Sequence, residues 1–395
     1  MSLPNELIDE ILCRLPVKPV LRFRCVSKGW CSLIDSNAFI KKHLKKTLEC
    51  NIGGGLIING DGGDFYLADF DSLDDADASA VRIDAPIKNL LVESQFVGAS
   101  NGLICVWQNQ MNDVFLFNPA TRKSRKIANS SPQMFPTSFS QFESFTCGFG
   151  YDQTNDDYKV VKVAECYSSR FRGKLAILYS LKTNTWTRIR NFPANIRITS
   201  NECVFTNGSL HWTAITNPVN GKDIILAFDL QLEQFKEVPS PPITRALVNF
   251  NWKCLVGVGE CLCFTDNYPE SSMDVWLMKD YGARNTWYKA FTVEQRSTLG
   301  SFSSFSPIAF SKSHSDVLLL EVDGKLVWYD PERKTVKNLR IRGIPVNCNL
   351  FFYTESLLRL TEDKPLQKKP SKDKKEKNQT TRRDGFLSKG FNLKL

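Results

Sequence analysis

The sequence predicts a small all-α unit, then an all-β propeller of about six four-stranded blades, then a disordered basic tail. Three observations support this fold class. Apolar residues recur at helical spacing within the first 45 residues. Short runs rich in β-branched and aromatic residues, separated by turn residues, extend from about residue 56 to residue 341. After Thr361 the character of the chain changes, and residues 364–383 are rich in lysine with almost nothing apolar. We therefore expect domains at residues 1–45, 50–360 and 361–395.

The N-terminal unit is predicted to contain three or four short helices. Pro4 suits a first helical turn, where its missing N–H would have no partner. Pro16 ends this first helix, because the residue before a proline is pushed out of the α region, and Pro19 opens the second. Ser27 is the expected N-cap of a third helix, and residues 38–44 form a fourth.

So small a unit cannot easily bury all of its apolar surface. Leu3, Pro4, Leu15, Pro16 and Val17 lie at predicted helix ends, where a small bundle covers side chains poorly. The pattern alone leaves two interpretations open. The helices either form a hook that buries apolar surface against another protein, or they cap the core of the next domain.

The β region contains an internal repeat. Three dipeptides typical of tight hairpins, Asn101-Gly102, Asn207-Gly208 and Asp323-Gly324, punctuate it. A strand that ends in an aromatic-rich element, a polar turn and a further strand then recur roughly every 50 residues, which is the period of a kelch-type propeller blade. The repeat positions are Tyr66, Phe117, Tyr179, Phe228, Trp276 and Trp328. One longer interval is explained by an insertion at residues 128–147.

A single blade cannot bury both faces of its sheet, so the repeats are expected to form a ring. The apolar run at residues 350–353, together with Leu357-Leu358, follows the last repeat and is predicted to return to the first blade and close the ring. The double glycine of a standard kelch blade is missing from most repeats. This departure leaves the blade count open by one and an incompletely closed ring as an alternative.

The first 44 residues resemble the F-box, and the whole chain resembles plant F-box proteins with a C-terminal F-box-associated, kelch-like domain. The resemblance rests on the run LPNELIDEILCRLPVKPVLRFRCVSKGW. It implies binding to a Skp-type adaptor and, through the adaptor, to a cullin ubiquitin ligase. The residues it implies for adaptor binding are Leu3, Pro4, Leu7, Leu12, Leu15, Pro16, Val17, Leu21, Val26 and Trp30.

Composition argues against disulfides, metals and membranes. The 12 cysteines include no CxxC pair, and many lie in apolar runs, so we expect buried free thiols rather than a zinc site. No apolar run approaches 18 residues, so no membrane span is expected. The N-terminus lacks a signal-peptide pattern, which predicts a location in the cytosol or nucleus.

Much of the net charge of +9 comes from the tail, which has eleven Lys/Arg and five Asp/Glu.

The sequence offers no catalytic set, and we expect neither enzyme activity nor a cofactor. The three histidines are His43, His211 and His314, and none falls in a catalytic motif. No GxSxG elbow or GxxxxGK phosphate loop is present. His211 precedes a tryptophan in a strand and is expected to be a packed, hydrogen-bonded histidine.

Binding is therefore the expected function of the propeller. The insertion carries aromatic side chains that would suit contact with a target protein, or that would equally pack onto their own blade. These candidate target-binding residues are Phe135, Phe139, Phe142 and Phe145. We expect a substrate-recognition subunit of a Skp–cullin–F-box ubiquitin ligase. The alternative is a propeller interaction protein that works without the ligase, with a nuclear role for its basic tail. Nucleic acid is not expected to be a partner.

Overall fold

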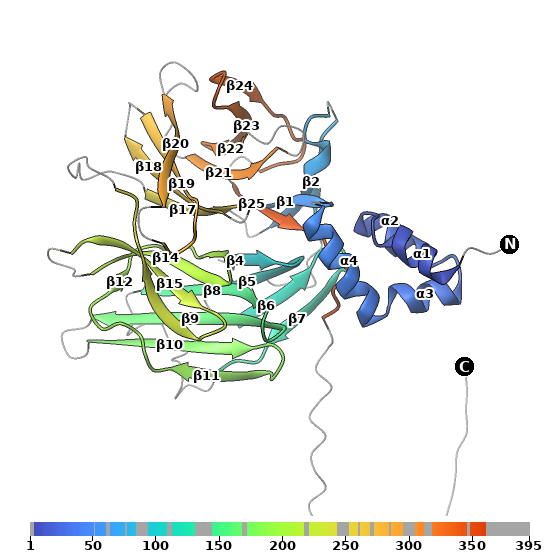
Figure 1. Ribbon diagram of the computed structural model, residues 1–395, viewed down its shortest axis with the longest axis horizontal. Coiled ribbons are helices and arrows are strands. Elements are labelled where there is room, and N and C mark those ends of the chain that lie inside the picture. Colours follow the sequence, from blue (N-terminus) through green and yellow to red (C-terminus); the bar gives the residue numbers. More distant parts are fainter. Residues whose placement is uncertain are drawn as a thin grey trace, which may run out of the picture. The chain divides into compact units, whose positions relative to one another are not determined.

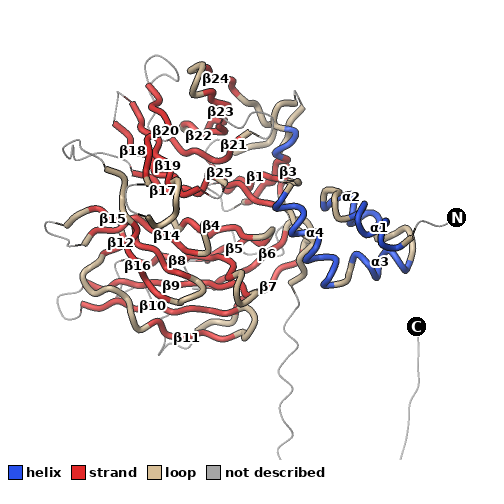
Figure 2. Tube along the Cα trace, in the orientation of Figure 1, coloured by secondary structure: helices blue, strands red, loops and turns tan. Residues whose placement is uncertain are grey.

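The computed structural model shows four helices followed by a ring of β-sheets (Figure 1). The structure describes residues 4–50, 52–60, 64–75, 77–83, 94–108, 113–130, 144–167, 172–216, 221–242, 253–259, 261–268, 272–283, 286–294, 305–311, 318–345 and 348–360. The predicted tail, residues 361–395, lies outside them. Apart from one short 3-10 turn at Phe70–Ser72, the described helices are confined to the N-terminal unit (Figure 2).

The four helices begin close to the predicted positions. They are α1 (Asn5–Leu12), α2 (Val17–Phe23), α3 (Lys28–Ile34) and α4 (Asn37–Glu49). The Oγ of Ser27 accepts a hydrogen bond from the Trp30 N–H at 3.1 Å, so the predicted N-cap is confirmed. Two details differ from the prediction. Pro16, rather than Pro19, precedes the second helix. The fourth helix is capped by Ser36 at its start and extends to Glu49, with Thr47 buried in its last turn.

Six antiparallel sheets follow, and each is one blade of the propeller. Blade 1 contains β25 (Cys348–Thr354), β1 (Gly54–Gly60), β2 (Phe65–Asp69) and β3 (Val81–Arg82). Blade 2 contains β4 (Ser94–Ser100), β5 (Leu103–Gln108), β6 (Asp113–Asn118) and β7 (Lys123–Ile127). Blade 3 contains β8 (Ser144–Asp152), β9 (Asp157–Tyr167), β10 (Arg172–Ser180) and β11 (Thr185–Ile189).

The other three blades repeat this order. Blade 4 contains β12 (Arg197–Ile198), β13 (Val204–Thr206), β14 (Ser209–Ile215), β15 (Asp223–Asp229) and β16 (Gln234–Val238), with both β12 and β13 paired to β14. Blade 5 contains β17 (Lys253–Val258), β18 (Cys261–Tyr268), β19 (Ser272–Met278) and β20 (Trp287–Glu294). Blade 6 contains β21 (Phe305–Phe310), β22 (Leu318–Val322), β23 (Lys325–Asp330) and β24 (Thr335–Asn338).

The repeat seen in the sequence corresponds to one strand of each blade. All six repeat positions lie on the third strand in sheet order, which is β2, β6, β10, β15, β19 and β23. The three predicted hairpin turns are also confirmed, because both central residues of each have positive φ, for example 52° at Asn101 and 81° at Gly102. The predicted fold class of helices followed by a six-bladed propeller is therefore confirmed.

The ring closes through its last strand. β25 pairs antiparallel with β1 over seven residue pairs, from Gly54 opposite Thr354 to Gly60 opposite Cys348. Blade 1 is thus built from both ends of the propeller sequence. The predicted return of residues 350–353 to the first blade is confirmed, and the incompletely closed alternative is not observed.

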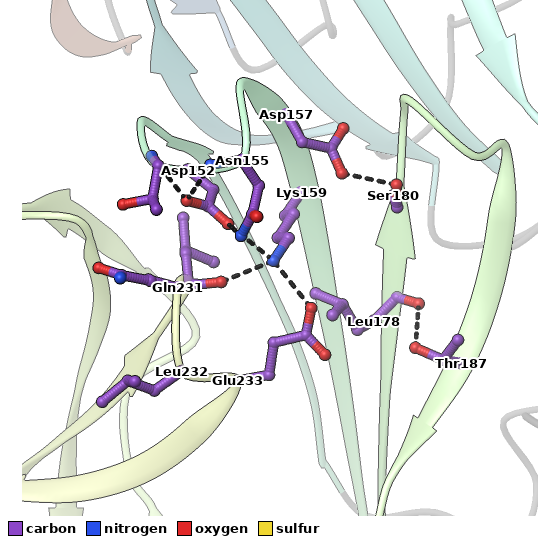
Figure 3. A network of polar contacts seen from close by, with 12 residues as sticks. Asp152, Asn155, Asp157, Lys159, Leu178, Ser180, Thr187, Gln231, Leu232 and Glu233 are labelled. Atoms are coloured by element: carbon purple, nitrogen blue, oxygen red, sulfur yellow. Dashed lines mark hydrogen bonds and ion pairs between the residues drawn. The ribbon is translucent and has the colours of Figure 1, made fainter.

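Blades 3 and 4 illustrate how neighbouring blades are held together, by apolar contacts and by an ion network around a buried lysine. Trp212 of β14 is fully buried in a cluster that spans blades 3 and 4, and its indole N–H donates to the Thr146 Oγ1 at 2.9 Å. The same two blades share Lys159 of β9, which reaches across to the turn between β15 and β16 (Figure 3). Blades 3 and 4 are therefore joined by apolar packing, hydrogen bonds and an ion pair. Among the described residues, no helix is both long and apolar enough to cross a membrane.

Candidate functional site

The helical unit leaves a small apolar surface uncovered. Leu7 and Ile11 of α1 are 51% and 52% exposed, and they stand four residues apart on one face of the helix. Val26, in the turn before α3, is 59% exposed. Single exposed leucines are common, but two on one turn of an otherwise packed helix indicate a contact surface.

The residues predicted to bind an adaptor occupy three kinds of position. Exposed are Pro4, Leu7, Pro16 and Val26; partly buried are Leu15, Leu21 and Trp30; and buried are Leu12 and Val17. Leu3 lies outside the described residues. Ile11 is exposed but is absent from the predicted set, although its spacing from Leu7 could have identified it. The assignment of these residues to adaptor binding stays a prediction.

Leu12 and Val17 are buried because they form the core of the helical unit. They pack with Val20, Ile34 and Leu357, the last of which comes from the far end of the chain. His43 of α4 is fully buried, with its Nε2 at 2.9 Å from the Leu15 carbonyl oxygen and its Nδ1 at 3.3 Å from the Thr47 Oγ1. Burial lowers the pKa of His43, so the ring is neutral at neutral pH and donates from Nε2. The core thereby fixes the orientation of α1.

Charged residues border the exposed face of α1. Glu10 lies 2.8 Å from Arg14 and 3.0 Å from Lys42 of α4, and their hydrogen bonds lower the pKa of Glu10 to about 2. Lys42 also pairs with Asp9. Alternating charges around an apolar centre are typical of protein interfaces with a polar rim.

On the propeller, the structure places one of the four predicted target-binding residues. Phe145 is in β8 and is partly buried, with its ring 6.2 Å from that of Trp107 in the neighbouring blade. Phe135, Phe139 and Phe142 lie outside the described residues. Phe145 packs against its own blade and the neighbouring one. A role of these four residues in binding a target stays a prediction.

Lys162 is a buried titratable group that sequence reasoning missed. It lies in β9 at 5.7 Å from the Trp107 ring and 5.2 Å from the Trp186 ring, and burial lowers its pKa to about 8. The two tryptophan rings and the nearby thiols of Cys105 and Cys147 surround the Lys162 side chain. The strand pattern of the sequence gave no reason to single out this lysine. Among the described residues, no group of three His, Cys, Asp or Glu side chains could hold a metal ion.

His211 is fully buried, as its sequence context predicts. One ring nitrogen lies 3.1 Å from the Val204 carbonyl oxygen and the other 2.5 Å from the Tyr281 hydroxyl, and burial lowers the pKa of His211 to about 4. The ring is therefore neutral in the folded protein.

A neutral buried histidine makes stability depend on pH. In the unfolded chain His211 takes up a proton below a pKa near 6.5, so the folded state loses stability as the pH falls from 6.5 towards 4, by up to ~3 kcal/mol. We expect His211→Gln to flatten the pH dependence of the free energy of unfolding, measured by urea titration at pH 7 and pH 5. If the free energy of unfolding changes equally between pH 7 and pH 5 in both proteins, His211 does not contribute to the pH dependence of stability.

Comparison with known proteins identifies both parts of the chain. Residues 1–42 match the F-box domain, and residues 62–359 match the F-box associated beta propeller domain. F-box protein CPR1 of Arabidopsis thaliana is 34% identical over 423 aligned positions, which cover 100% of both chains. F-box protein At4g22390 of the same plant is 28% identical, covering 99% of each chain, and F-box/kelch-repeat protein At3g23880 is 29% identical over 74% of this chain and 79% of its own.

Proposed function

This chain belongs to the F-box proteins that carry an F-box-associated β-propeller, and from this membership we propose that it is the substrate-recognition subunit of a Skp–cullin–F-box ubiquitin ligase. The helical unit binds a Skp-type adaptor, and the propeller binds a protein target. The chain itself carries out no chemical step. It raises the local concentration of the target's lysines near a ubiquitin-charged enzyme held elsewhere in the assembly.

One observation supports the adaptor-binding role above the others. Leu7 and Ile11 are half-exposed on a helix whose opposite face is fully packed through Leu12. These side chains are not needed to fill the core of this chain. Their burial against a partner would contribute about 2 kcal/mol each, which is enough to make them dominant contacts in an interface.

The test is a double substitution at this surface. We expect Leu7→Asp with Ile11→Asp to weaken binding of a purified Skp-type adaptor at least ~100-fold, because both contacts are lost and two charges are placed in the interface. Binding is measured by titration calorimetry with the full chain. The fold should persist, since both positions face solvent in the free protein.

A matched control uses an exposed leucine elsewhere in the helical unit. Leu48 of α4 is 51% exposed, so Leu48→Asp repeats the chemistry at a similar exposure. We expect its adaptor affinity to stay within about twofold of the unaltered chain. If the double variant binds as tightly as this control, the surface of α1 is not the docking site.

A further inference from the structure

The core of the helical unit is completed by the C-terminal end of the described chain. Residues 355–360, here called the C-terminal strap, follow β25 directly. Leu357 of the strap is only 3% exposed and packs with Leu12, Val17 and Ile34 of the helices. A residue more than 300 positions away in sequence thus fills the core of the adaptor-binding unit.

The other side of the strap is fixed to the propeller. Asn118, at the end of β6, donates from Nδ2 to the Ser356 carbonyl oxygen at 3.1 Å and to the Leu358 carbonyl oxygen at 2.8 Å. Leu360 packs into the core shared by blades 2 and 3. The strap therefore packs Leu357 and part of Leu358 against the helices, while its backbone is bound to blade 2.

The propeller surface is shaped to receive the strap. Gly102, in the turn between β4 and β5, has a φ of +81°, and a Cβ there would lie 2.7 Å from the Ser356 backbone nitrogen. A side chain at this position would collide with the strap. The hairpin glycine consequently serves both the turn and the close approach of the strap.

Ion pairs at the same junction bring helices and propeller together. Arg359 of the strap pairs with Asp35 after α3, and Lys18 of α2 lies 3.5 Å from Glu355. Lys41 of α4 pairs with Asp156 in the turn between β8 and β9. These partly exposed pairs are individually weak, so they orient the junction more than they stabilise it.

Short helices need such support. Three of the four helices have seven or eight residues, and isolated helices of this length do not persist in water. Their order depends on packing, and Leu357 supplies part of that packing. The strap continues directly from the end of β25, so the pairing of β25 with β1 brings the strap to the helices.

We propose that the C-terminal strap couples adaptor binding to closure of the propeller. Leu357, seated among the helices once the ring is complete, holds them in their adaptor-binding arrangement. A chain with an unfinished propeller would then be a poor partner for the adaptor, which restricts the ligase to receptors that can hold a target. This coupling rests on the proposed function for its adaptor, whereas the ordering of the helices by the strap can be measured without one.

The experiment compares full-length variants that differ in the strap. Leu357→Asp places a charge in the helical core, and Leu357→Met keeps its volume and apolar character. Leu232→Asp is the matched control, because Leu232 is 62% exposed in the turn between β15 and β16. Arg359→Glu sets a like charge against Asp35 without altering a buried side chain. Amide hydrogen exchange of α1–α4 and affinity for a purified Skp-type adaptor are measured for each.

We expect Leu357→Asp to raise exchange in α1–α4 and to weaken adaptor binding, each at least tenfold, while exchange in β9 and β14 stays protected. Arg359→Glu should raise exchange in α1–α4 and weaken adaptor binding by a few-fold each. Leu357→Met and Leu232→Asp should match the unaltered chain in both measurements. Unchanged helix exchange, or unchanged adaptor affinity, in Leu357→Asp would overturn the coupling. Failure of the unaltered chain to bind the adaptor would instead overturn the proposed function, and the exchange data would still report whether the strap orders the helices.

Discussion

A chain that ends at Pro345, and so lacks β25 and everything after it, is expected to lose the cooperative unfolding of its propeller. The removed segment pairs with the whole of β1 and contributes three buried apolar side chains, Tyr353, Leu357 and Leu360. At about 2 kcal/mol each, these side chains alone are worth ~6 kcal/mol, which is comparable to the 5–15 kcal/mol that stabilises a typical folded domain.

The loss also exposes a strand edge. Leu56, Ile57 and Ile58 of β1 are fully buried in the closed ring. Without β25, their strand becomes an unpaired apolar edge that can pair with other chains. We therefore expect the truncated chain to aggregate as well as to unfold at lower denaturant concentration.

The control for this truncation ends at Leu360. It keeps β25 and the C-terminal strap and removes only residues 361–395. Calorimetry and gel filtration should show a single sharp transition and a monomer for the control, and a broad transition with aggregates for the shorter chain. If both chains melt alike, closure through β25 does not hold the ring together.

Substitution of Lys159 by methionine is expected to destabilise the propeller by about 3 kcal/mol. Its Nζ lies 2.9 Å from the Asp152 Oδ2 within blade 3. It also lies 2.8 Å from the Glu233 Oε1 and 2.6 Å from the Leu230 carbonyl oxygen, and these two contacts link blade 3 to blade 4 (Figure 3). The side chains of Lys159 and Asp152 are only 4% and 1% exposed. Removing one partner of a buried pair leaves the other charge uncompensated.

Asp152 keeps some support after the change, which limits the loss. Its carboxylate also accepts hydrogen bonds from the backbone N–H groups of Thr154 and Asn155 and from the Asn155 side chain. Burial works to raise the pKa of Asp152, but the hydrogen bonds from Asn155 and Lys159 outweigh it and lower that pKa. The stabilisation is thus present above the usual carboxyl pKa and is lost as the pH falls below it.

Lys236 provides the matched control for Lys159. It pairs with Asp229 at 3.0 Å, but its side chain is 41% exposed, so Lys236→Met should cost less than 1 kcal/mol. Free energies of unfolding from urea titration at pH 7 compare the two variants. If the two variants lose similar amounts of unfolding free energy, burial of the Lys159 network does not increase its contribution to stability.

The sequence alone was sufficient to predict the general architecture. Turn dipeptides such as Asn101-Gly102 demand positive φ, which few other residues tolerate, so their positions reveal hairpins directly. The repeat positions mark the third strand of every blade because each blade must bury equivalent side chains against its neighbours. Likewise, the cap at Ser27 follows from local hydrogen bonding.

The sequence alone cannot tell which apolar side chains of a short helix are exposed, because a residue that faces a partner and one that faces the core look the same in the pattern. Leu12 and Val17 lie buried in the free chain and Ile11 is exposed, while the assignment of the predicted residues to adaptor binding stays a prediction. The structure supports the cap interpretation through Leu12, which packs with Leu357 from the end of the propeller sequence. Leu7 is exposed, which leaves the hook interpretation as a prediction.

Local residue preferences thus predicted the helices, the hairpins and the repeat, and the resemblance of the sequence to known proteins predicted the family. Only the tertiary structure decided which apolar side chains are covered, because coverage depends on segments far apart in sequence. No local pattern could indicate that Leu357 completes the helical core, or that Lys159 finds Glu233 in the next blade. Closure of the ring brings these partners together, and burial then gives their contacts their strength.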